Sequence, residues 1–346
     1  SESQIQHFAV VLMASPKNPN TFTDNPLDRA SHLRADQAWL DNAHKSSATR
    51  FVPLAKLKPL ISAPCEEGGQ CDIGWVQPSD LTGVDLSNSV FLGLDQGQPY
   101  FAADISKLVD QEETAPFSEI GTFEDLLSVV TQLEPRNASL LAQAKSMIDW
   151  HRRHGFCAQC GVPTTLADAG YRRDCPECKS QHFPRTDPVV ISLVVKNEKC
   201  LLGRNAMFKG PMFTALAGFL EPGETVEEAV AREVMEEVGL EVTNVTYHST
   251  QPWPYPSSLM IGCIADAVTD TITLDEKEIV EARWFNREEL RDALHHSVSV
   301  NYQKLMGGNE VFQPSEFFVP PSTAIAHQLL RYWADDTTAE KGKYYD

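Results

Sequence analysis

The chain has 346 residues, of which 42% are hydrophobic, 9% aromatic and 22% charged. This composition is typical of a soluble globular protein and excludes a disordered or fibrous one, and the length is enough for two domains with a small insert. The 48 acidic and 29 basic residues give a net charge of −19. Such an acidic surface repels bulk nucleic acid and anionic membranes, and a phosphate-bearing substrate would need metal ions to reverse the local charge.

No part of the sequence is apolar over the roughly 20 residues that a membrane span requires. The first residues show no basic stretch followed by an apolar segment and a cleavage site, and the C-terminus is not a peroxisomal tripeptide. We therefore expect a cytoplasmic protein in a reducing compartment, with no membrane partner. These observations leave an organellar location open.

The first 145 residues mix short strand-like and helix-like segments around a turn-rich stretch at Pro64–Gln70. The strand-like segments are Phe8–Met13, Val90–Leu94 and Tyr100–Asp104. The helix-like segments are Arg34–Ala43 and Thr122–Leu133. This pattern predicts an N-terminal α/β domain over residues 1–145, and by itself it indicates no chemistry for that domain.

The rest of the chain begins with a predicted helix at Ala138–Arg153, which leads into four clustered cysteines. Further elements follow in chain order: a strand at Val189–Val195, a loop at 209–223, a helix at 225–238, strands at Leu259–Val268 and Ala282–Phe285, and a helix at Ser322–Trp333. We therefore predict a cysteine module at 150–185, a second α/β domain at 186–334 and a frayed polar tail at 335–346.

The clustered cysteines form two Cys-x2-Cys pairs, and 14 residues separate the pairs. They are Cys157, Cys160, Cys175 and Cys178. In a chain without a secretory signal this spacing predicts one tetrahedral zinc site, which is structural because four thiolates leave no open ligand position. Because four thiolates already fill the ligand positions of the zinc ion, His151 and His154 are not expected to be ligands, although both lie close to Cys157 in the sequence.

A zinc module that reads nucleic acid is the alternative. Such a module would need a basic face. Its basic residues are Arg172, Arg173, Lys179 and Arg185, and the nearby acidic residues are Asp168, Asp174, Glu177 and Asp187. Because the acidic residues offset the basic ones, no basic face is expected. Among the other cysteines, we expect Cys65 and Cys71 to be loop or core thiols. Cys200 and Cys263 lie in strand-like runs and are expected to be buried.

An amphipathic helix with an unusual acidic face is predicted after Thr225. Thr225 and Glu228 have the spacing of a capping box, and Gly239 suits the left-handed position just past a helix end. Apolar residues recur at spacings of three and four and predict a buried stripe: Val226, Ala229, Val230, Val234 and Val238. The opposite side carries three glutamates beside Arg232: Glu233, Glu236 and Glu237.

Like charges at these spacings destabilise a helix by about 0.2–0.5 kcal/mol per pair, so something must offset the repulsion. Divalent cations bound by carboxylate oxygens would do so, and Mg²⁺ typically shares its ligands with substrate phosphates. A solvated acidic face is the simpler alternative.

The pattern extends beyond the helix. From Gly218 to Leu240 the chain reads Gly-x5-Glu-x7-Arg-Glu-Val-x-Glu-Glu-x-Gly-Leu, which resembles the Nudix box at every defined position. The resemblance implies an α/β (α+β) Nudix fold, with a mixed sheet between helices, and metal-dependent hydrolysis of phosphoric anhydrides. It also implies that Glu233, Glu236 and Glu237 bind the metal and that Arg232 orients them.

A proline-rich segment follows the box: Gln251, Pro252, Trp253, Pro254, Tyr255, Pro256, Ser257 and Ser258. Its three prolines force an extended backbone, and a purely structural loop is the alternative interpretation. The segment is similar to the SQPWPFPxS signature of the NADH pyrophosphatase subfamily, with Thr250 and Tyr255 in place of Ser and Phe. Zinc ribbon, Nudix box and signature come in the order typical of that subfamily, which the chain therefore resembles.

Weaker resemblance extends over most of the chain, through Asp36–Leu40, Phe51–Leu54 and Gly97–Asp104. It implies further site residues. Glu278 and the backbone carbonyl of Ala217 would complete a site for two to three Mg²⁺ or Mn²⁺ ions. The nicotinamide and nucleotide pockets would be lined by Phe183, Phe219, Gln251–Ser258 and Ala326.

The activity that the resemblance implies is hydrolysis of the pyrophosphate bond of NADH, and more weakly of NAD, to reduced nicotinamide mononucleotide and AMP. Glu237 or Glu236 would accept the proton of the attacking water, and the enzyme would be a homodimer. Removal of NAD caps from RNA 5′ ends is an alternative with the same chemistry. A catalytically silent interaction scaffold is a third hypothesis, against which the four glutamates argue.

Overall fold

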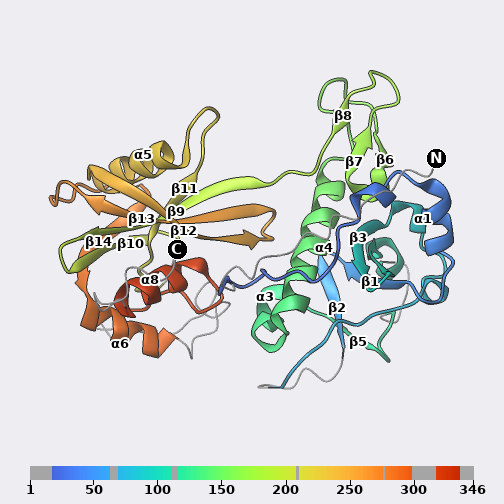
Figure 1. Cartoon of the computed structure of the whole chain (residues 1–346), viewed down its shortest axis with the longest axis horizontal. Helices are drawn as coiled ribbons and strands as arrows, with labels where there is room; N and C mark the ends of the chain where they lie inside the picture. The colour runs from blue at the N-terminus through green and yellow to red at the C-terminus, as the bar shows by residue number, and fades with distance from the viewer. Residues whose placement is uncertain are drawn as a thin grey trace, which may run out of the picture.

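The computed structural model describes residues 18–62, 69–110, 116–207, 210–275, 277–297 and 317–335. Figure 1 shows two lobes joined by extended chain, with a small three-stranded sheet projecting from the first. We call them the N-terminal lobe (18–153), the ribbon (154–185) and the C-terminal lobe (186–335). The predicted segment Phe8–Met13, most of Pro64–Gln70 and most of the tail lie outside the described residues.

The N-terminal lobe is built on a five-stranded sheet in the order β3-β4-β1-β2-β5, in which β1 and β4 are parallel. Its strands are β1 (Arg50–Ala55), β2 (Lys58–Ser62), β3 (Val90–Asp95), β4 (Gln98–Asp104) and β5 (Gly121–Phe123). Its helices are α1 (Gln37–Ala43), α2 (Ser106–Val109), α3 (Leu126–Val129) and the long α4 (Pro135–Arg153). Short 3-10 helices cover Ser31–Leu33, Pro78–Asp80, Leu86–Asn88, Val130–Gln132 and, in the ribbon, Asp168–Gly170.

Two of the expected helices in this lobe are shorter than predicted. α1 begins only at Gln37 because the side chain of Asp36 accepts a hydrogen bond from the Trp39 amide (2.9 Å) and caps the helix there. The segment Thr122–Leu133 is not a single helix, because its first residues pair with β2 and Asp125 caps a separate short helix. Tertiary pairing overrides local helix propensity at this point.

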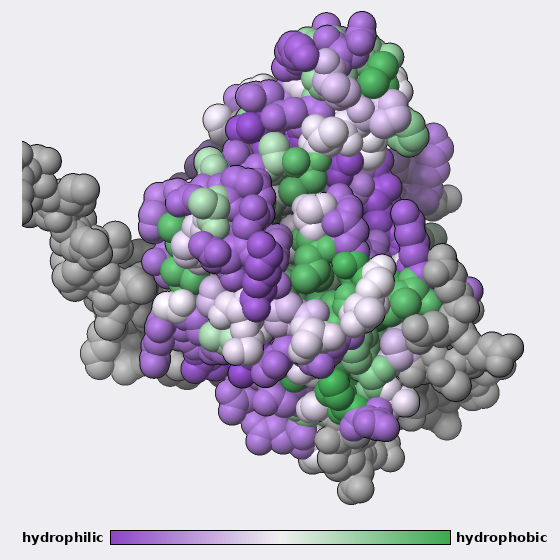
Figure 2. Space-filling view, turned by 90° about the vertical axis from the view of Figure 1, so that its right-hand side faces the viewer, coloured by the Kyte–Doolittle hydropathy of each residue, from purple (hydrophilic) through white to green (hydrophobic). Residues whose placement is uncertain are grey.

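The ribbon is a three-stranded antiparallel sheet of β6 (Thr165–Ala167), β7 (Arg172–Asp174) and β8 (Gln181–His182). Figure 2 shows the side of the molecule that the ribbon and the N-terminal lobe form. Hydrophilic residues cover most of that side, and hydrophobic residues gather in an area below the ribbon.

The C-terminal lobe contains a six-stranded mixed sheet, in which five strands lie in the order β12-β13-β9-β10-β14. The sixth strand, β11, pairs with residues 189–192 of β9, while β10 pairs with residues 194–196 of the same strand. The pair β13–β9 is parallel. The strands are β9 (Asp187–Lys196), β10 (Lys199–Asn205), β11 (Leu216–Phe219), β12 (Val242–Trp253), β13 (Ser258–Ala267) and β14 (Ile279–Asn286).

Helices cover both faces of this sheet. Helix α5 (Val226–Val238) lies on one face, and α6 (Arg287–Ser297) and α8 (Ile325–Asp335) lie on the other (Figure 1). A separate cluster of buried apolar side chains fills each interface, one centred on Val230 and Val234 and the other on Leu290 and Leu329. The expected mixed sheet between helices is confirmed.

Part of the region expected to be a loop is a strand. Residues 209–223 contain β11, in which Ala217 pairs with Ile191 and Gly218 with Val190 of β9. Glycine and proline on both sides of this segment obscured it, because its four residues are too few to show a period of two.

The structure also tests the expectations for three cysteines outside the ribbon. Cys200 and Cys263 are buried in β10 and β13, as expected. Cys71 is buried and disulfide-bonded, so its assignment as a free thiol was wrong. No helix in the described part of the chain combines the length and apolarity needed to cross a membrane.

Candidate active site

Helix α5 carries the candidate site, and its ends form as its sequence predicts. Thr225 Oγ1 accepts from the Glu228 amide (3.2 Å), while the Glu228 carboxylate accepts from the Thr225 amide (2.8 Å). Gly239 ends the helix in the left-handed conformation at φ 69°. These caps fix where the helix begins and ends.

The three glutamates of the helix differ strongly in burial. The Glu236 side chain is 61% exposed, that of Glu233 is 13% exposed, and Glu237 as a residue is 3% exposed. The expectation that all three lie opposite the apolar stripe is therefore wrong for Glu237. Glu237 follows Val230 by seven residues, which is nearly two full turns, so it lies close to the buried stripe.

Arg232 is the cation that holds this acidic surface together. Its guanidinium makes two hydrogen bonds to the Glu224 carboxylate (2.6 and 2.9 Å) and one each to Glu233 (2.8 Å) and Glu236 (3.1 Å). It also donates to the Phe219 carbonyl (2.9 Å). The hydrogen bonds from Arg232 lower the pKa of Glu224 to about 2, so that carboxylate stays charged. The loop before the helix and the helix itself are thus tied to one guanidinium.

Gly218 leaves room for the Glu233 carboxylate. A Cβ atom added there would lie 1.9 Å from that carboxylate. The strand β11 therefore passes directly against the end of Glu233, and a side chain at position 218 would displace the carboxylate from its present position.

The electrostatics of Glu237 are unusual for a carboxylate. Burial, together with the negative charges of Glu278, Glu233 and Glu236, raises its pKa to about 8. Its Oε2 atom is buried and has no hydrogen-bond partner. Burial also raises the pKa of Glu233. A buried carboxylate oxygen without a partner is costly, so this position fits a divalent cation.

The other residues expected to bind metal lie near this position along the backbone. Ala217 directly precedes Gly218 in β11. The Asp275 amide donates to the Glu237 carbonyl (3.1 Å) and the Glu278 amide donates to the Asp275 carbonyl (3.1 Å), so the segment that carries Glu278 is fastened to the end of α5. The Glu278 side chain is exposed.

The proline-rich signature and the glutamate loop lie at the same end of the sheet. Phe219 of β11 pairs with Val189 of β9, and Val189 pairs on its other side with Met260 of β13. Two strand spacings, or about 10 Å, therefore separate the start of β13 from the loop before α5. A cavity of about 660 Å³ opens at this end, and Phe219, Glu224 and Arg185 are among its lining residues.

The signature itself forms the end of β12, a turn and the start of β13. Gln251 is buried and makes three hydrogen bonds: its amide donates to the carbonyls of Thr21 (3.1 Å) and Thr323 (2.8 Å), and its carbonyl accepts from the Ile325 amide (2.8 Å). The ring of Trp253 packs edge-on against Phe22 (centroids 6.0 Å apart). The backbone is extended as predicted only at Gln251–Trp253 and at Ser258; residues 254–257 form a turn, so the prediction of an extended segment was wrong there, and part of the segment also serves as a structural junction.

The remaining expected substrate residues lie apart from one another. Phe219 and Phe183 are each 60% exposed, on β11 and just after β8. Ala326 is buried in the first turn of α8, on the face of the sheet opposite α5. The structure thus places Phe219 beside the glutamates and Ala326 away from them.

The four ribbon cysteines meet in one cluster. Their sulfur atoms all lie within 4.8 Å of one another, and Cys157–Cys178 and Cys160–Cys175 are 3.5 and 3.4 Å apart. A tetrahedral zinc site with Zn–S bonds of about 2.3 Å requires sulfur atoms roughly 3.8 Å apart, so the donor set fits zinc. Within the described residues this is the one group of three or more His, Cys, Asp or Glu side chains drawn together so closely.

Hydrogen bonds around the cluster involve one histidine that the sequence analysis did not single out. His182 Nε2 lies 3.3 Å from Cys157 Sγ. By contrast, His151 bonds to the Gly170 carbonyl (2.8 Å) and to Arg173 (2.9 Å), and His154 bonds to the Trp150 carbonyl (3.0 Å). The position of His182 one strand beyond the last cysteine pair gave no sequence signal, because it depends on the β7–β8 pairing.

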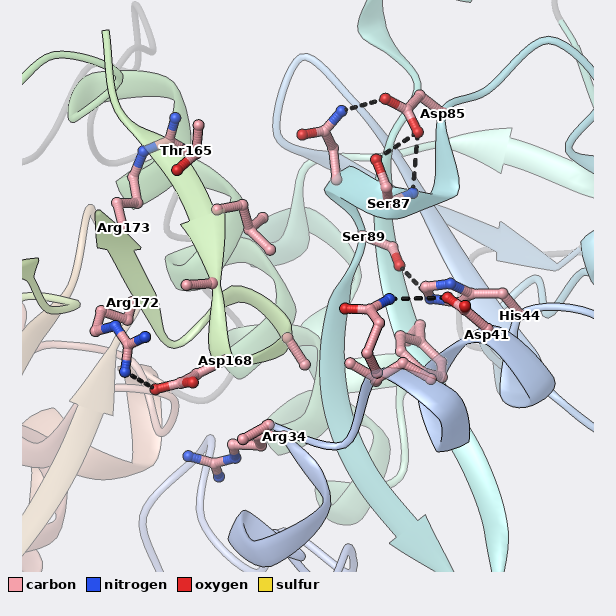
Figure 3. Close-up of a pocket in the computed structure, with 18 of the residues that line it drawn as sticks. Arg34, Asp41, His44, Asp85, Ser87, Ser89, Thr165, Asp168, Arg172 and Arg173 are labelled. Carbon is pink, nitrogen blue, oxygen red and sulfur yellow. Dashed lines mark hydrogen bonds and ion pairs between the residues drawn. The ribbon is translucent and has the colours of Figure 1, made fainter. Parts of the chain in front are cut away.

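A second cavity, of about 710 Å³, lies between the ribbon and the N-terminal lobe (Figure 3). Several of its polar side chains are paired with one another: Arg172 with Asp168 (2.6 Å) on one wall, and His44 with Ser89 (3.1 Å) on the other. Arg172 also pairs with Asp174 (2.7 Å). These pairs leave no free basic face on this part of the ribbon, so the candidate active site is the glutamate helix.

Comparison with known proteins agrees with this location. The family model described as "NUDIX domain" matches residues 185–305, "NADH pyrophosphatase zinc ribbon domain" matches 152–183, and "NADH pyrophosphatase-like rudimentary NUDIX domain" matches 48–150. A solved NUDIX hydrolase from Nitrosomonas europaea aligns at 22% identity over 48% of this chain and 97% of its own, with a TM-score of 0.35.

Relatives cover most of the chain. The human "NAD-capped RNA hydrolase NUDT12" is 37% identical over 91% of this chain and 73% of its own length. The mouse "NAD(P)H pyrophosphatase NUDT13, mitochondrial" is 38% identical over 86% of this chain and 82% of its own. The Saccharomyces cerevisiae "NAD-capped RNA hydrolase NPY1" is 29% identical over 90% and 94%.

The chain therefore belongs to the NADH pyrophosphatase family of Nudix hydrolases, as the box, the signature and the cysteine spacing predicted. It is an enzyme of the class that hydrolyses phosphoric anhydrides.

We expect Gly218→Ala to weaken metal binding at α5 by about 10- to 100-fold, since the new methyl group displaces the Glu233 carboxylate. Mn²⁺ titration followed by electron paramagnetic resonance measures this affinity. Gly155→Ala is the matched control, because a Cβ there meets nothing within 4 Å. Wild-type Mn²⁺ affinity in Gly218→Ala would contradict the packing argument.

We expect Glu237→Gln to stabilise the protein at pH 8 in metal-free buffer. The folded-state pKa of about 8 exceeds the ordinary value of 4.5, so the folded state holds the extra proton and wild-type stability falls as pH rises between these values. Removing the charge should therefore raise the free energy of unfolding by about 2–4 kcal/mol at pH 8 and by little at pH 5.

Urea denaturation at the two pH values, with buffers passed over a chelating resin, measures this difference. Glu236→Gln is the control, because that side chain is largely exposed and its charge costs little. An equal effect of both substitutions would contradict the special burial of Glu237.

Proposed function

We propose that this protein hydrolyses the pyrophosphate bond of NADH, and more weakly that of NAD and related dinucleotides, to reduced nicotinamide mononucleotide and AMP. The observation that carries the proposal is the buried, unpartnered Glu237 carboxylate oxygen within the Nudix box. The mouse relative named as an NAD(P)H pyrophosphatase supports the substrate class.

Glu233, Glu236, Glu237 and Glu278, with the Ala217 carbonyl, would hold two to three Mg²⁺ or Mn²⁺ ions. Bound divalent ions supply positive charge to the substrate diphosphate and acidify an attacking water. Arg232 would hold Glu233 and Glu236 in fixed orientations and reduce their mutual repulsion, since it bonds to both carboxylates. The Cys157, Cys160, Cys175 and Cys178 thiolates would hold one structural Zn²⁺.

Proton transfer is assigned to the glutamates of α5. Glu237, through a carboxylate oxygen that no ion occupies, would accept the proton of the attacking water. Glu236 is the alternative base.

The substrate would lie at the end of the sheet where β11 and the signature meet. Phe219 and Phe183 would stack on the nicotinamide, and Gln251–Ser258 would line the nucleotide pocket, with a backbone contact from Ala326. The high exposure of Phe183 and Phe219 supports this role, because an exposed aromatic face is free to receive a flat ring. A homodimer, in which Phe183 approaches a partner subunit, is part of the proposal.

Location and domain limits are also proposals. We propose a cytoplasmic enzyme, although relatives include proteins named as mitochondrial and chloroplastic. We propose the division into an N-terminal domain (1–145), a zinc ribbon (150–185), a Nudix domain (186–334) and a tail (335–346).

We expect metal-dependent release of AMP and reduced nicotinamide mononucleotide, fastest from NADH, when NADH, NAD and ADP-ribose are tested in parallel with Mg²⁺ or Mn²⁺. Glu237→Gln should keep the fold and lower kcat at least about 100-fold, as expected for loss of a general base or metal ligand. Glu227→Gln, an exposed change on the same helix, is the control.

Chromatography of the products, with and without chelator, measures both the metal-dependent substrate preference and the loss of turnover in Glu237→Gln. Cleavage of ADP-ribose alone would overturn the substrate, and near-wild-type turnover by Glu237→Gln would overturn the site. Absence of turnover on every dinucleotide would favour a silent scaffold.

Removal of NAD caps from RNA is the second candidate, because two of the relatives are named as NAD-capped RNA hydrolases. The net charge of −19 gives little attraction for the RNA body. We therefore expect KM for a capped RNA to change little more with salt than KM for NAD. A steep salt dependence confined to the RNA would instead indicate a dedicated RNA site.

A further inference from the structure

The signature hairpin, which we define as residues 251–258, is held by the N-terminal lobe as well as by its own sheet. Lys145 and Ser146 of α4 both reach it: Lys145 Nζ donates to the Pro254 carbonyl (3.0 Å), and Ser146 Oγ donates to the Pro256 carbonyl (3.3 Å). Prolines cannot donate from their own backbone, so the backbone of Pro254 and Pro256 can form hydrogen bonds only through these carbonyls.

Lys145 is an unusual residue for this position. It is 7% exposed, and its ammonium group lies 4.3 Å from the centre of the Tyr255 ring. In the described part of the chain it makes no ion pair; Asp125 and Asp149 act on it only as more distant charges, and Asp149 is paired with Arg153. A buried ammonium is costly unless it is compensated, and here the compensation comes from a carbonyl and an aromatic face of the hairpin.

The strand that leads into the hairpin is held from the same lobe. Asn20 is 4% exposed, and its side-chain amide donates to Ser249 Oγ and to the Thr250 carbonyl (both 2.9 Å). Asn18 also donates to the Thr250 carbonyl (2.8 Å). The segment that carries both asparagines runs between the two lobes in Figure 1. Within the hairpin, Gln251 donates to the Thr21 carbonyl and Trp253 packs against Phe22, so two separate parts of the N-terminal lobe contact the hairpin and the strand that leads into it.

We propose that Lys145 is a positioning residue, which fixes the signature hairpin so that the N-terminal lobe sets the affinity of the enzyme for its dinucleotide substrate. This inference rests on the proposed function, since it takes the hairpin to be part of the substrate pocket. Lys145 acts through the hairpin and not on the substrate, because its ammonium group is enclosed. The N-terminal lobe thereby gains a role in binding although none of the α5 carboxylates belongs to it.

The test is Lys145→Met in the full-length chain. Methionine keeps the length of the side chain and removes the buried charge, so global stability should be unchanged or raised. We expect hydrogen–deuterium exchange at the amides of residues 251–258 to rise at least about tenfold, since local opening is no longer opposed by the ammonium group. We expect KM for NADH to rise about tenfold with kcat within about twofold of wild type.

Lys196→Met is the matched control, because Lys196 also donates to a backbone carbonyl, that of Val268 (2.9 Å), at the other end of the sheet. It should leave exchange in the hairpin and both kinetic constants unchanged. Ser146→Ala is a second, milder variant that should shift exchange and KM in the same direction as Lys145→Met.

Unchanged exchange in the hairpin of Lys145→Met would overturn the proposal, as would raised exchange with an unchanged KM. A fall in kcat as large as the rise in KM would also overturn it, because that result indicates general damage. If the wild-type protein cleaves no dinucleotide, the proposed function fails and the effect on substrate affinity fails with it. The exchange measurement still decides, in that case, whether Lys145 fixes the hairpin.

Discussion

The crowding of negative charge at the end of α5 is the constraint around which the C-terminal lobe is arranged. Glu233, Glu236 and Glu237 repel one another, and burial makes the repulsion at Glu237 more costly. One guanidinium, that of Arg232, bonds to Glu233 and Glu236 but not to Glu237, whose buried Oε2 atom has no hydrogen-bond partner. The folded chain thus leaves one buried carboxylate oxygen without a protein partner, and an oxygen of this kind suits a divalent cation.

Much of the surrounding architecture keeps this arrangement in place. Gly218 lets β11 pass against the Glu233 carboxylate, and the pairing of β11 with β9 fixes the position of Gly218. The apolar side of α5, centred on Val230 and Val234, is buried against the sheet, and this packing opposes a rotation of the helix that would bring Glu237 into water. The free energy gained by burying the apolar side of α5 therefore offsets the electrostatic cost of bringing these carboxylates together.

The two lobes and the ribbon have separable tasks. The four ribbon cysteines converge without any contribution from the C-terminal lobe, and the Arg172 ion pairs stay within the ribbon. The N-terminal lobe instead reaches the C-terminal lobe at the signature, through Lys145, Asn20 and the contact of Phe22 with Trp253. If the hairpin lines the substrate pocket, as proposed, a lobe that carries none of the α5 carboxylates would influence that pocket by holding the hairpin.

The sequence by itself determined the family, the cysteine cluster, the limits of α5 and the presence of a mixed sheet between helices. These features depend on short-range patterns: cysteine spacing, a capping box, a fixed set of glutamates and apolar runs. The sequence also located the candidate glutamates, although it placed Glu237 on the wrong side of the helix stripe.

Only the tertiary structure decided the features that depend on pairing between distant residues. β11 was hidden in an expected loop, because four residues show no period and its strand character comes from β9. The burial of Glu237 required knowing how α5 rotates onto the sheet. The contact of Lys145 with Pro254 joins residues 109 positions apart, and His182 meets Cys157 across 25 positions. Side chains that meet only through folding leave no local signal, so residue spacing could not reveal these contacts.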